Sequence, residues 1–344
     1  MLSSGAESFV SQSGEGIEEG VSGGASRVSS ALERLKVTCH EFTRLERARI
    51  PPVRLLHATA AGLHAFAAAV DLCEDAGIER TTLLPFVEPL RALHAQSPFV
   101  HRLQAWPRGY AGDFETIEYL CDAENRAPVG TVAWAIEQYA LQSPIAQQHR
   151  NKVGLQARAI LSTLLAKRDA RIASIGCGGC RDLSLVQHHI PRDAGMFVLV
   201  DSDAEALAFA RQRLDRLSDR CQFVRGRVPR VLTAPALRDA SGQFDLIVAG
   251  GLFDYLQDDW AIATLRLARR MIAPNGRLIL SNIAAGNPFR AWLEYLAEWT
   301  LIERQPEDLG RLLAAADFPA EHLHISRDSS GLALMADVRM AGTG

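Results

Sequence analysis

The sequence has few features that direct a protein to membranes, nucleic acid or oxidising compartments. Its 344 residues carry a formal net charge of −3, so no global positive field attracts nucleic acid or anionic lipid. No apolar run reaches the ~18–20 residues that span a bilayer, and the N-terminus shows no secretory signal. The six cysteines are scattered, which is typical of a reduced protein. We therefore expect a cytoplasmic protein, monomeric or homodimeric, with neither a nucleic-acid partner nor a membrane span.

Changes in composition divide the chain into four parts. Residues 1–25 are rich in Ser, Gly and Glu and predict a disordered tail. Residues 26–105 carry apolar side chains at three- and four-residue steps, which predicts an N-terminal helical domain. Residues 106–168 combine a Pro- and Gly-containing loop with long helices that link to the next part, with a kink expected at Pro144. Residues 169–344 alternate short apolar runs with helical patterns.

The last part predicts an α/β fold. The runs "ARIASIG", "MFVLVD", "CQFVRG", "FDLIVAGG" and "RLILSNI" are apolar enough to be strands covered on both faces of a parallel sheet. The final runs, "EHLHISR" and "LALMADVRM", are separated by too few residues for a crossover and must form an antiparallel hairpin. A mostly parallel Rossmann-like sheet that ends in such a hairpin is the layout of class I methyltransferases.

A glycine-rich stretch, "IGCGGCRD", lies between a predicted strand and a predicted helix. Gly176, Gly178 and Gly179 allow close approach of the backbone to a ligand, and the helix N-terminus directs amides at it. Arg181 stands where the dinucleotide fingerprint requires its third glycine. The stretch therefore favours S-adenosylmethionine (SAM) over a nicotinamide dinucleotide.

Two acidic residues follow the second predicted strand, in "VLVDSD". Asp201 ends the strand, where a carboxylate can accept hydrogen bonds from both ribose hydroxyls of the cofactor. Asp203 is placed to cap the next helix. Cys177 and Cys180 form a C-x-x-C pair, but no second pair is present, so we predict that they pack around the cofactor and hold no metal.

Several motifs together resemble one family. "RGYAGDFETI", "SIGCGGCRDL", "LVDSDAEALAFA", "FDLIVAGGLFDYL", "APNGRLILSNI" and "WLEYLAEWTLIER" occur in this order. They resemble the bacterial SAM-dependent methyltransferases of extracellular-factor biosynthesis, which make 3-hydroxypalmitic acid methyl ester. The resemblance covers roughly Trp106 to Arg339 and is most specific in "GYAGD" and "GLFDYL".

The resemblance implies a SAM site with a cap. "GYAGD" would close the cofactor pocket, and the loop around Gly250–Asp254 would flank the methyl group. The residue two before the first loop glycine is commonly acidic, but it is Ser174 here. Asp113, Asp182 or Asp254 would therefore take the ammonium group of SAM. The full set of predicted cofactor contacts is Tyr110, Asp113, Gly176, Cys177, Gly178, Asp182, Asp201, Ser202, Gly250 and Gly251.

The acceptor stays open at this point. A carboxylate acceptor needs no base, and Arg108, His149 or Arg150 would hold it. An amine or hydroxyl acceptor benefits from a base, for which Tyr110, His149, Asp254 and Tyr255 are the catalytic candidates. We predict methyl transfer to a small-molecule or acyl-type metabolite, with methyl ester formation as one form. The alternatives are N- or O-methylation of a secondary metabolite, an NAD(P)-dependent oxidoreductase and a non-catalytic SAM-binding protein.

One aromatic stripe bears on the size of the acceptor. Trp292, Tyr295 and Trp299 fall three and four residues apart in "AWLEYLAEW". This spacing predicts one face of a helix that packs in the core or at a domain interface, and the alternative is the wall of an acyl pocket.

Overall fold

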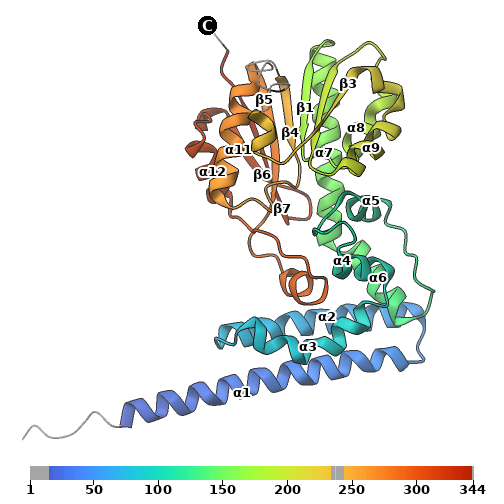
Figure 1. Ribbon diagram of the computed structural model, residues 1–344. Helices are drawn as coiled ribbons and strands as arrows, with labels where there is room; N and C mark the ends of the chain where they lie inside the picture. The colour runs from blue at the N-terminus through green and yellow to red at the C-terminus, as the bar shows by residue number, and fades with distance from the viewer. Residues whose placement is uncertain (1–14, 234–236, 238–243, 343–344) are drawn as a thin grey trace, which may run out of the picture.

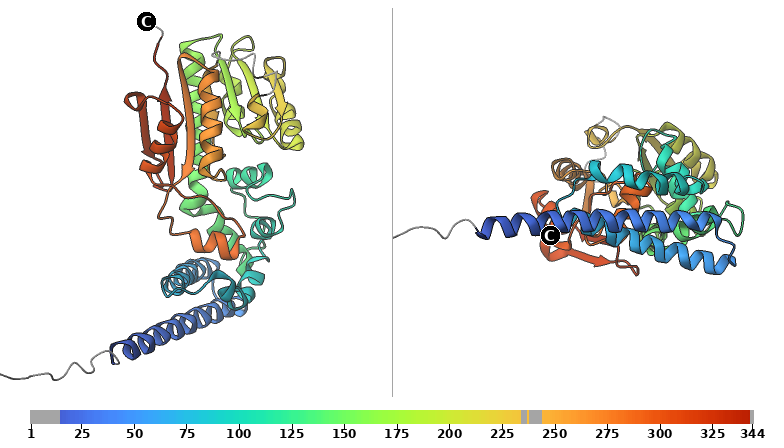
Figure 2. Two further views of the ribbon diagram at one scale, coloured as in Figure 1. Left: turned by 60° about the vertical axis from the view of Figure 1, so that its left-hand side comes forward. Right: turned by 90° about the horizontal axis from the view of Figure 1, so that it is seen from below.

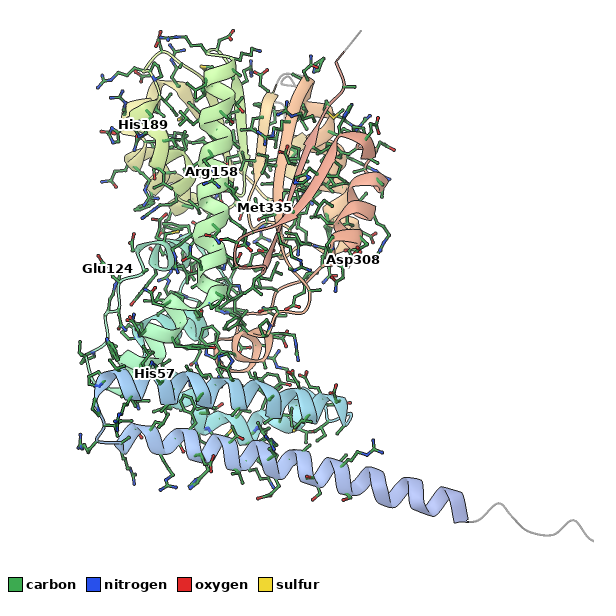
Figure 3. The ribbon with its side chains drawn as sticks, turned by 180° about the vertical axis from the view of Figure 1, so that it is seen from behind. His57, Glu124, Arg158, His189, Asp308 and Met335 are labelled. Atoms are coloured by element: carbon green, nitrogen blue, oxygen red, sulfur yellow. The ribbon has the colours of Figure 1, made fainter. Side chains whose placement is uncertain are left out.

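The computed structural model describes residues 15–233, 237 and 244–342, and it divides into a helical layer and a sheet (Figure 1). The layer consists of α1, α2 and α3, and three short helices connect it to the sheet. A long helix, α7, runs from this connection along the back of the sheet (Figure 3). The bounds are α1 Glu15–Thr43, α2 Pro52–Asp75, α3 Arg80–His94, α4 Pro98–Ala105, α5 Phe114–Asp122, α6 Val132–Gln142 and α7 Pro144–Ala166.

The sheet has seven strands in the order β3-β2-β1-β4-β5-β7-β6. The first five are parallel to their neighbours, while β7 is antiparallel to both β5 and β6, which confirms the predicted hairpin. The bounds are β1 Arg171–Ile175, β2 Met196–Asp201, β3 Cys221–Arg225, β4 Phe244–Ala249, β5 Ile272–Ile283, β6 Leu323–Arg327 and β7 Ala333–Arg339.

Helices cover both faces of the sheet because its strands are apolar on both sides. In β2, Phe197 and Leu199 join a core cluster with residues of α7, α8 and α9. Val198 and Val200, which alternate with them, join a cluster with residues of α11 and α12. The class I methyltransferase layout predicted from these runs is confirmed. These helices are α8 Arg181–Val186, α9 Ala204–Arg213, α11 Asp258–Met271 and α12 Pro306–Ala315.

The helical layer has its own core, and a segment from the C-terminal half joins it. After β5 the chain returns to the layer, where Trp292, Tyr295 and Trp299 are buried among residues of α1 to α6. This segment contains a π-helical turn, Trp292–Leu296, where a regular helix was expected. The Tyr295 hydroxyl donates to Glu74 of α2 at 2.8 Å. The stripe is therefore a domain interface, as predicted from its spacing.

Two expectations about the helices need correction. Helix α1 begins at Glu15, inside the predicted tail, and its N-terminal end projects beyond the other helices (Figure 2); residues 1–14 lie outside the described residues. Extending a helix that is already packed adds one hydrogen bond per residue, which explains the early start. The helix expected to kink at Pro144 is instead broken at Ser143, because Pro144 begins a new helix.

Helix α2 bears on the expected absence of a membrane span. By length and composition alone it is long and apolar enough to cross a membrane. Its residues Leu63, Phe66 and Val70 are buried in the core of the helical layer. Core helices of soluble proteins pass the same test of length and composition, so the helix does not establish a span.

Candidate functional site

A cavity of about 610 Å³ lies at the carboxyl ends of β1, β2 and β4. Ligands of open α/β sheets bind at this edge, and the volume is in the usual range for small-molecule sites. Its walls come from the glycine loop, the loop after β4, one face of α7 and residues 106–113, which we call the cap loop. The cavity brings together most of the predicted site residues: Tyr110, His149, Gly176, Cys177, Gly178, Asp182, Asp201, Ser202, Gly250, Gly251, Asp254 and Tyr255.

The glycine loop is shaped to receive a ligand. Gly176 and Gly178 have φ values of 66° and 51°, which favour glycine over residues with a Cβ. The amides of Gly176 and Cys177 both donate to the Val200 carbonyl, at 2.8 and 3.0 Å, and so tie the loop to β2. A Cβ on Gly179 would meet Phe209 of α9 at 2.9 Å. The loop therefore needs glycine for both conformation and space.

Asp201 fixes this loop from the end of β2. Its Oδ2 accepts the Gly178 amide at 2.8 Å and its Oδ1 accepts the Asp203 amide at 2.9 Å. Burial raises the pKa of Asp201, against the lowering effect of these amides. The carboxylate retains lone pairs that face the cavity beside Ser202. Asp201 therefore lies where the ribose of a cofactor bound along the loop would reach it.

The cap loop is held onto the sheet domain by Asp203. Arg108 donates to both oxygens of this carboxylate at 2.6 Å, and the Tyr110 hydroxyl donates to Oδ2 at 3.0 Å. Asp203 also caps α9 by accepting the Glu205 amide, which confirms the predicted capping role. The hydrogen bonds with Arg108 lower the pKa of Asp203 to about 2. Arg108 pairs with both Asp203 and Glu205 and also lines the cavity, so its role as an acceptor anchor stays a prediction.

Two cap-loop residues make contacts that the sequence only partly indicates. A Cβ at Gly112 would overlap the Tyr255 hydroxyl, so the glycine lets the cap approach the loop after β4. Asp113 does not line the cavity, contrary to the predicted cofactor contact. It is buried, accepts the Thr116 amide as the cap of α5, and pairs with Arg102 at 2.7 Å. Both contacts are made by Oδ1 of the carboxylate.

The "GLFDYL" loop after β4 forms the opposite wall. A Cβ at Gly250 would overlap the Gln156 amide, and the Gly251 amide donates to Ser281 Oγ at 3.0 Å. Phe253 packs in the core with 1% exposure, while Asp254 and Tyr255 line the cavity. Buried Arg304 donates to the Phe253 and Leu256 carbonyls at 2.8 and 2.6 Å and holds the loop in place.

A polar stripe on α7 was only partly recognised from the sequence. His149, Lys152 and Gln156 all line the cavity. Their spacing of three and four residues places them on one helix face. Lys152 is 3% exposed, and its Nζ lies 3.0 Å from Asp254 Oδ2. The spacing was visible in the sequence, but nothing there places this face against the sheet edge.

His149 lies beside an aromatic ring and is uncharged. Its ring stacks on Trp299, with centroids 5.5 Å apart and an interplanar angle of 22°. Burial, with Lys152 and Arg150 nearby, lowers its pKa well below the usual value. Arg150 does not line the cavity, so its predicted role as an acceptor anchor is wrong; it donates to the Leu120 carbonyl at 2.7 Å.

A second, small apolar pocket of about 10 Å³ lies behind His149. His149 lines both this pocket and the large cavity, and Trp299 stacks on it. The two spaces therefore share one wall. The other lining residues are Phe99, Leu103, Leu120, Ala140, Ile145, Ala146, Trp292, Leu293 and Leu301.

Charged and sulfur-containing residues of the glycine loop have structural partners. Arg181 pairs with Glu118 of α5 at 2.7 Å and so connects the loop to the helix after the cap. The Cys177 and Cys180 thiols hydrogen-bond to each other, and this bond and burial raise the pKa of Cys180. The bond lowers the pKa of Cys177, but burial together with the nearby Asp201 and Asp182 carboxylates raises it overall. Thiols with raised pKa are poor nucleophiles and ligands, consistent with packing.

The residues present fit SAM. The loop glycines leave room for the adenosyl and methionine portions, and Asp201 stands at the ribose position of nucleotide-binding sheets. The cavity walls also place two further carboxylates, Asp182 and Asp254, within the same space.

Comparison with known proteins agrees with this geometry. Residues 173–278 match the family described as a methyltransferase domain, and no curated protein matches the chain. The chain is similar to the structure of a possible exported protein from Bordetella parapertussis, at 17% identity and a TM-score of 0.56, with 93% of this chain and 97% of that chain covered. It is also similar to the CurJ carbon methyltransferase, at 13% identity and a TM-score of 0.50, with 92% and 93% covered. At these identities the similarity shows the fold alone, including the helical part. The fold is that of a class I methyltransferase, and its cofactor is SAM.

Proposed function

We propose that this SAM-dependent methyltransferase methylates the carboxylate of an apolar small-molecule acid and releases a methyl ester. Bound SAM supplies a methyl group that is already activated by a sulfonium. A carboxylate oxygen forms the new bond to the methyl carbon, and the electron pair of the broken S–CH₃ bond goes to sulfur. No proton moves, so the protein has to bind, align and desolvate the acid.

The observation that carries the proposal is the buried Lys152 on the cavity wall. Its ammonium group has three N–H donors, and Asp254 is the carboxylate that accepts from it, at 3.0 Å. Asp254 Oδ1 is also occupied, by the Ile283 amide at 2.5 Å. Lys152 can therefore donate to an acceptor carboxylate without losing its own partner. Such charge-assisted hydrogen bonds are the strong ones.

The two tyrosines and the histidine that were candidate bases are poorly suited to that role. Burial raises the pKa of both Tyr110 and Tyr255, so their hydroxyls stay protonated at neutral pH. The lowered pKa of His149 makes it a weak base. An acceptor that is already ionised at neutral pH avoids this difficulty. The reaction also neutralises a sulfonium and a carboxylate, which a dry site with an uncharged His149 favours.

The apolar body of the acid is expected on the His149–Trp299 side. The small pocket behind this pair is lined almost entirely by apolar side chains, and it adjoins the wall that carries Lys152. The resemblance of "GYAGD" and "GLFDYL" to the makers of 3-hydroxypalmitic acid methyl ester supports an acyl-type acceptor. The pocket has room for about one water molecule in this structure, so a long chain requires the stack to move.

The test uses methyl-labelled SAM with a series of fatty and aryl acids and with the corresponding alcohols and amines. We expect labelled product from acids only, and alkaline hydrolysis must release the label as methanol because esters are base-labile. Base-stable label, from an ether or an N-methyl product, would overturn the proposal in favour of O- or N-methylation of another acceptor.

A substitution at Lys152 tests whether this residue holds the acceptor carboxylate. Lys152→Gln is expected to raise the KM for the acid at least tenfold, as the loss of a charged hydrogen bond suggests, while the Kd for S-adenosylhomocysteine (SAH) is retained. Lys167→Gln is the matched control, because Lys167 is half exposed and pairs with Asp245 away from the cavity. An unchanged KM in Lys152→Gln would show that Lys152 does not hold the acceptor carboxylate.

A further inference from the structure

Asp182 is a buried carboxylate that faces the cavity without a cation. It lines the cavity with 6% exposure, at the start of α8 directly after the glycine loop. Its Oδ1 accepts the Leu183 amide at 2.8 Å. Among the described residues no Lys, Arg or His forms an ion pair with it, whereas buried carboxylates are usually paired.

The other acidic residues of the site already have partners. Asp254 pairs with Lys152 at 3.0 Å. Glu118 accepts from Arg181 and Arg213 at 2.7 and 2.5 Å. Each of these carboxylates is thus neutralised within the described part of the chain.

Two further acidic residues are accounted for in other ways. Asp113 does not line the cavity and pairs with Arg102. Asp201 accepts two backbone amides at the predicted ribose position. Of the three residues expected to replace an acid at position 174, Asp182 is therefore the one whose charge is not compensated by the protein.

Asp182 lines the cavity where the glycine loop ends and α8 begins. Ser174, at the usual acidic position, lines the same cavity but carries no charge. Gly176 to Gly179 connect β1 to α8, so a methionine moiety laid along this loop ends near the start of α8. We infer that Asp182 binds the α-ammonium group of SAM and SAH. The inference rests on the cofactor and not on the acceptor.

The ionisation behaviour of Asp182 agrees with this assignment. Burial raises its pKa to about 6, against the lowering effect of the backbone amides. A carboxylate whose ionised form is disfavoured in the empty site gains from a bound cation, because the ammonium supplies the compensating charge. A purely structural helix-capping carboxylate would instead have its charged form stabilised by the amides.

The test is a cycle between one protein change and one ligand change. Isothermal titration measures binding of SAH and of its desamino analogue, which lacks only the amino group, to the wild type and to Asp182→Asn. We expect Asp182→Asn to weaken SAH binding about tenfold or more, as the loss of a charged hydrogen bond implies. The desamino analogue, already weaker with the wild type, should bind both proteins equally.

Two outcomes would overturn the inference. Unchanged SAH binding in Asp182→Asn would show that Asp182 makes no contact with the cofactor. An equal loss for SAH and the desamino analogue would show a structural role only. Asp182→Ser, which keeps an oxygen for the Leu183 amide, repeats the cycle if the Asn variant does not fold.

Controls separate this test from the proposed function. Asp193→Asn is the matched control, because Asp193 is an exposed carboxylate paired with Arg168. Both ligands lack a transferable methyl group, so no result depends on the acceptor. If SAH binding shows no dependence on Asp182, the proposal of methyl ester formation is unaffected. If the acceptor assay gives a base-stable product, the assignment of Asp182 to the ammonium group is unaffected.

Discussion

Replacing Asp182 with Asn should stabilise the empty protein while it weakens cofactor binding. The carboxyl has an ordinary pKa of 3.8, which folding raises to about 6. The folded state therefore binds this proton more tightly than the unfolded state does. The stability that results is complete below the ordinary pKa and is lost as the pH rises through about 6. Above that pH, folding carries the cost of an uncompensated buried charge.

The magnitude follows from the shift. A difference of about 2 pKa units corresponds to about 3 kcal/mol in full, and to about 1 to 2 kcal/mol between pH 5 and pH 8. Asn has the same shape but does not titrate. The gain in stability of Asp182→Asn over the wild type should therefore be largest at pH 8 and should shrink towards pH 5.

The measurement is the difference in melting temperature between the two proteins, without ligand, across this pH range. The gain at pH 8 should exceed the gain at pH 5 by roughly 2–8 °C, given a few degrees per kcal/mol in domains of this size. Asp193→Asn should show no such pH-dependent gain. A difference that stays flat with pH would refute the buried, unpaired charge. Saturating SAH should reverse the order, because it stabilises the wild type more.

Three further changes test the walls of the site. Gly250→Ala should weaken SAH binding about tenfold, because the added methyl overlaps Gln156. Gly154→Ala on α7 is the control and should leave binding unchanged, because a Cβ there meets nothing. Calorimetry measures SAH binding to both variants. Asp203→Asn should speed hydrogen exchange of the cap-loop amides, because that loop loses its partner on the sheet domain. Unchanged exchange would show that Asp203 does not hold the cap loop in place. Asp201→Ala should weaken SAM binding by at least ~1.5 kcal/mol. An unchanged Kd would show that Asp201 does not bind the ribose of SAM.

The sheet and the cofactor half of the site were predictable because they depend on local patterns. Each buried strand is a short apolar run, and the glycine loop and Asp201 follow directly from the ends of β1 and β2. Parallel strands bring their carboxyl ends to one edge, so Gly250 and Gly251 could be placed there as well. These inferences needed no knowledge of how distant helices pack.

The acceptor half was not predictable for the opposite reason. Lys152 lies in a helix whose sequence does not separate clearly into an apolar face and a polar face. From the sequence alone, a lysine in such a helix is expected to be solvated. It becomes a site residue only because α7 passes the carboxyl edge of the sheet and meets Asp254, 102 positions later in the chain. The error with Arg150 has the same origin, since its partner, the Leu120 carbonyl, is set by tertiary packing.

The helical layer supports the acceptor wall from outside it. Trp299 stacks on His149, and its Nε1 donates to the Tyr255 hydroxyl at 2.8 Å, so it joins α7 to the "GLFDYL" loop. The residue before it, Glu298, pairs with Arg91 of α3, and its carbonyl accepts from Trp106 Nε1 at 3.1 Å.

The position of Trp299 is therefore set from two sides. Helix α3 and the cap loop hold the segment that carries it, and Gly112 of the cap loop leaves space for the Tyr255 hydroxyl and the Trp299 ring. Any movement of the helical layer would shift the ring that stacks on His149, which lines the cavity beside Lys152. The "GLFDYL" loop, α7 and the Trp299 segment are thus three segments that meet at this wall, and the helical layer contacts it through the Trp299 segment.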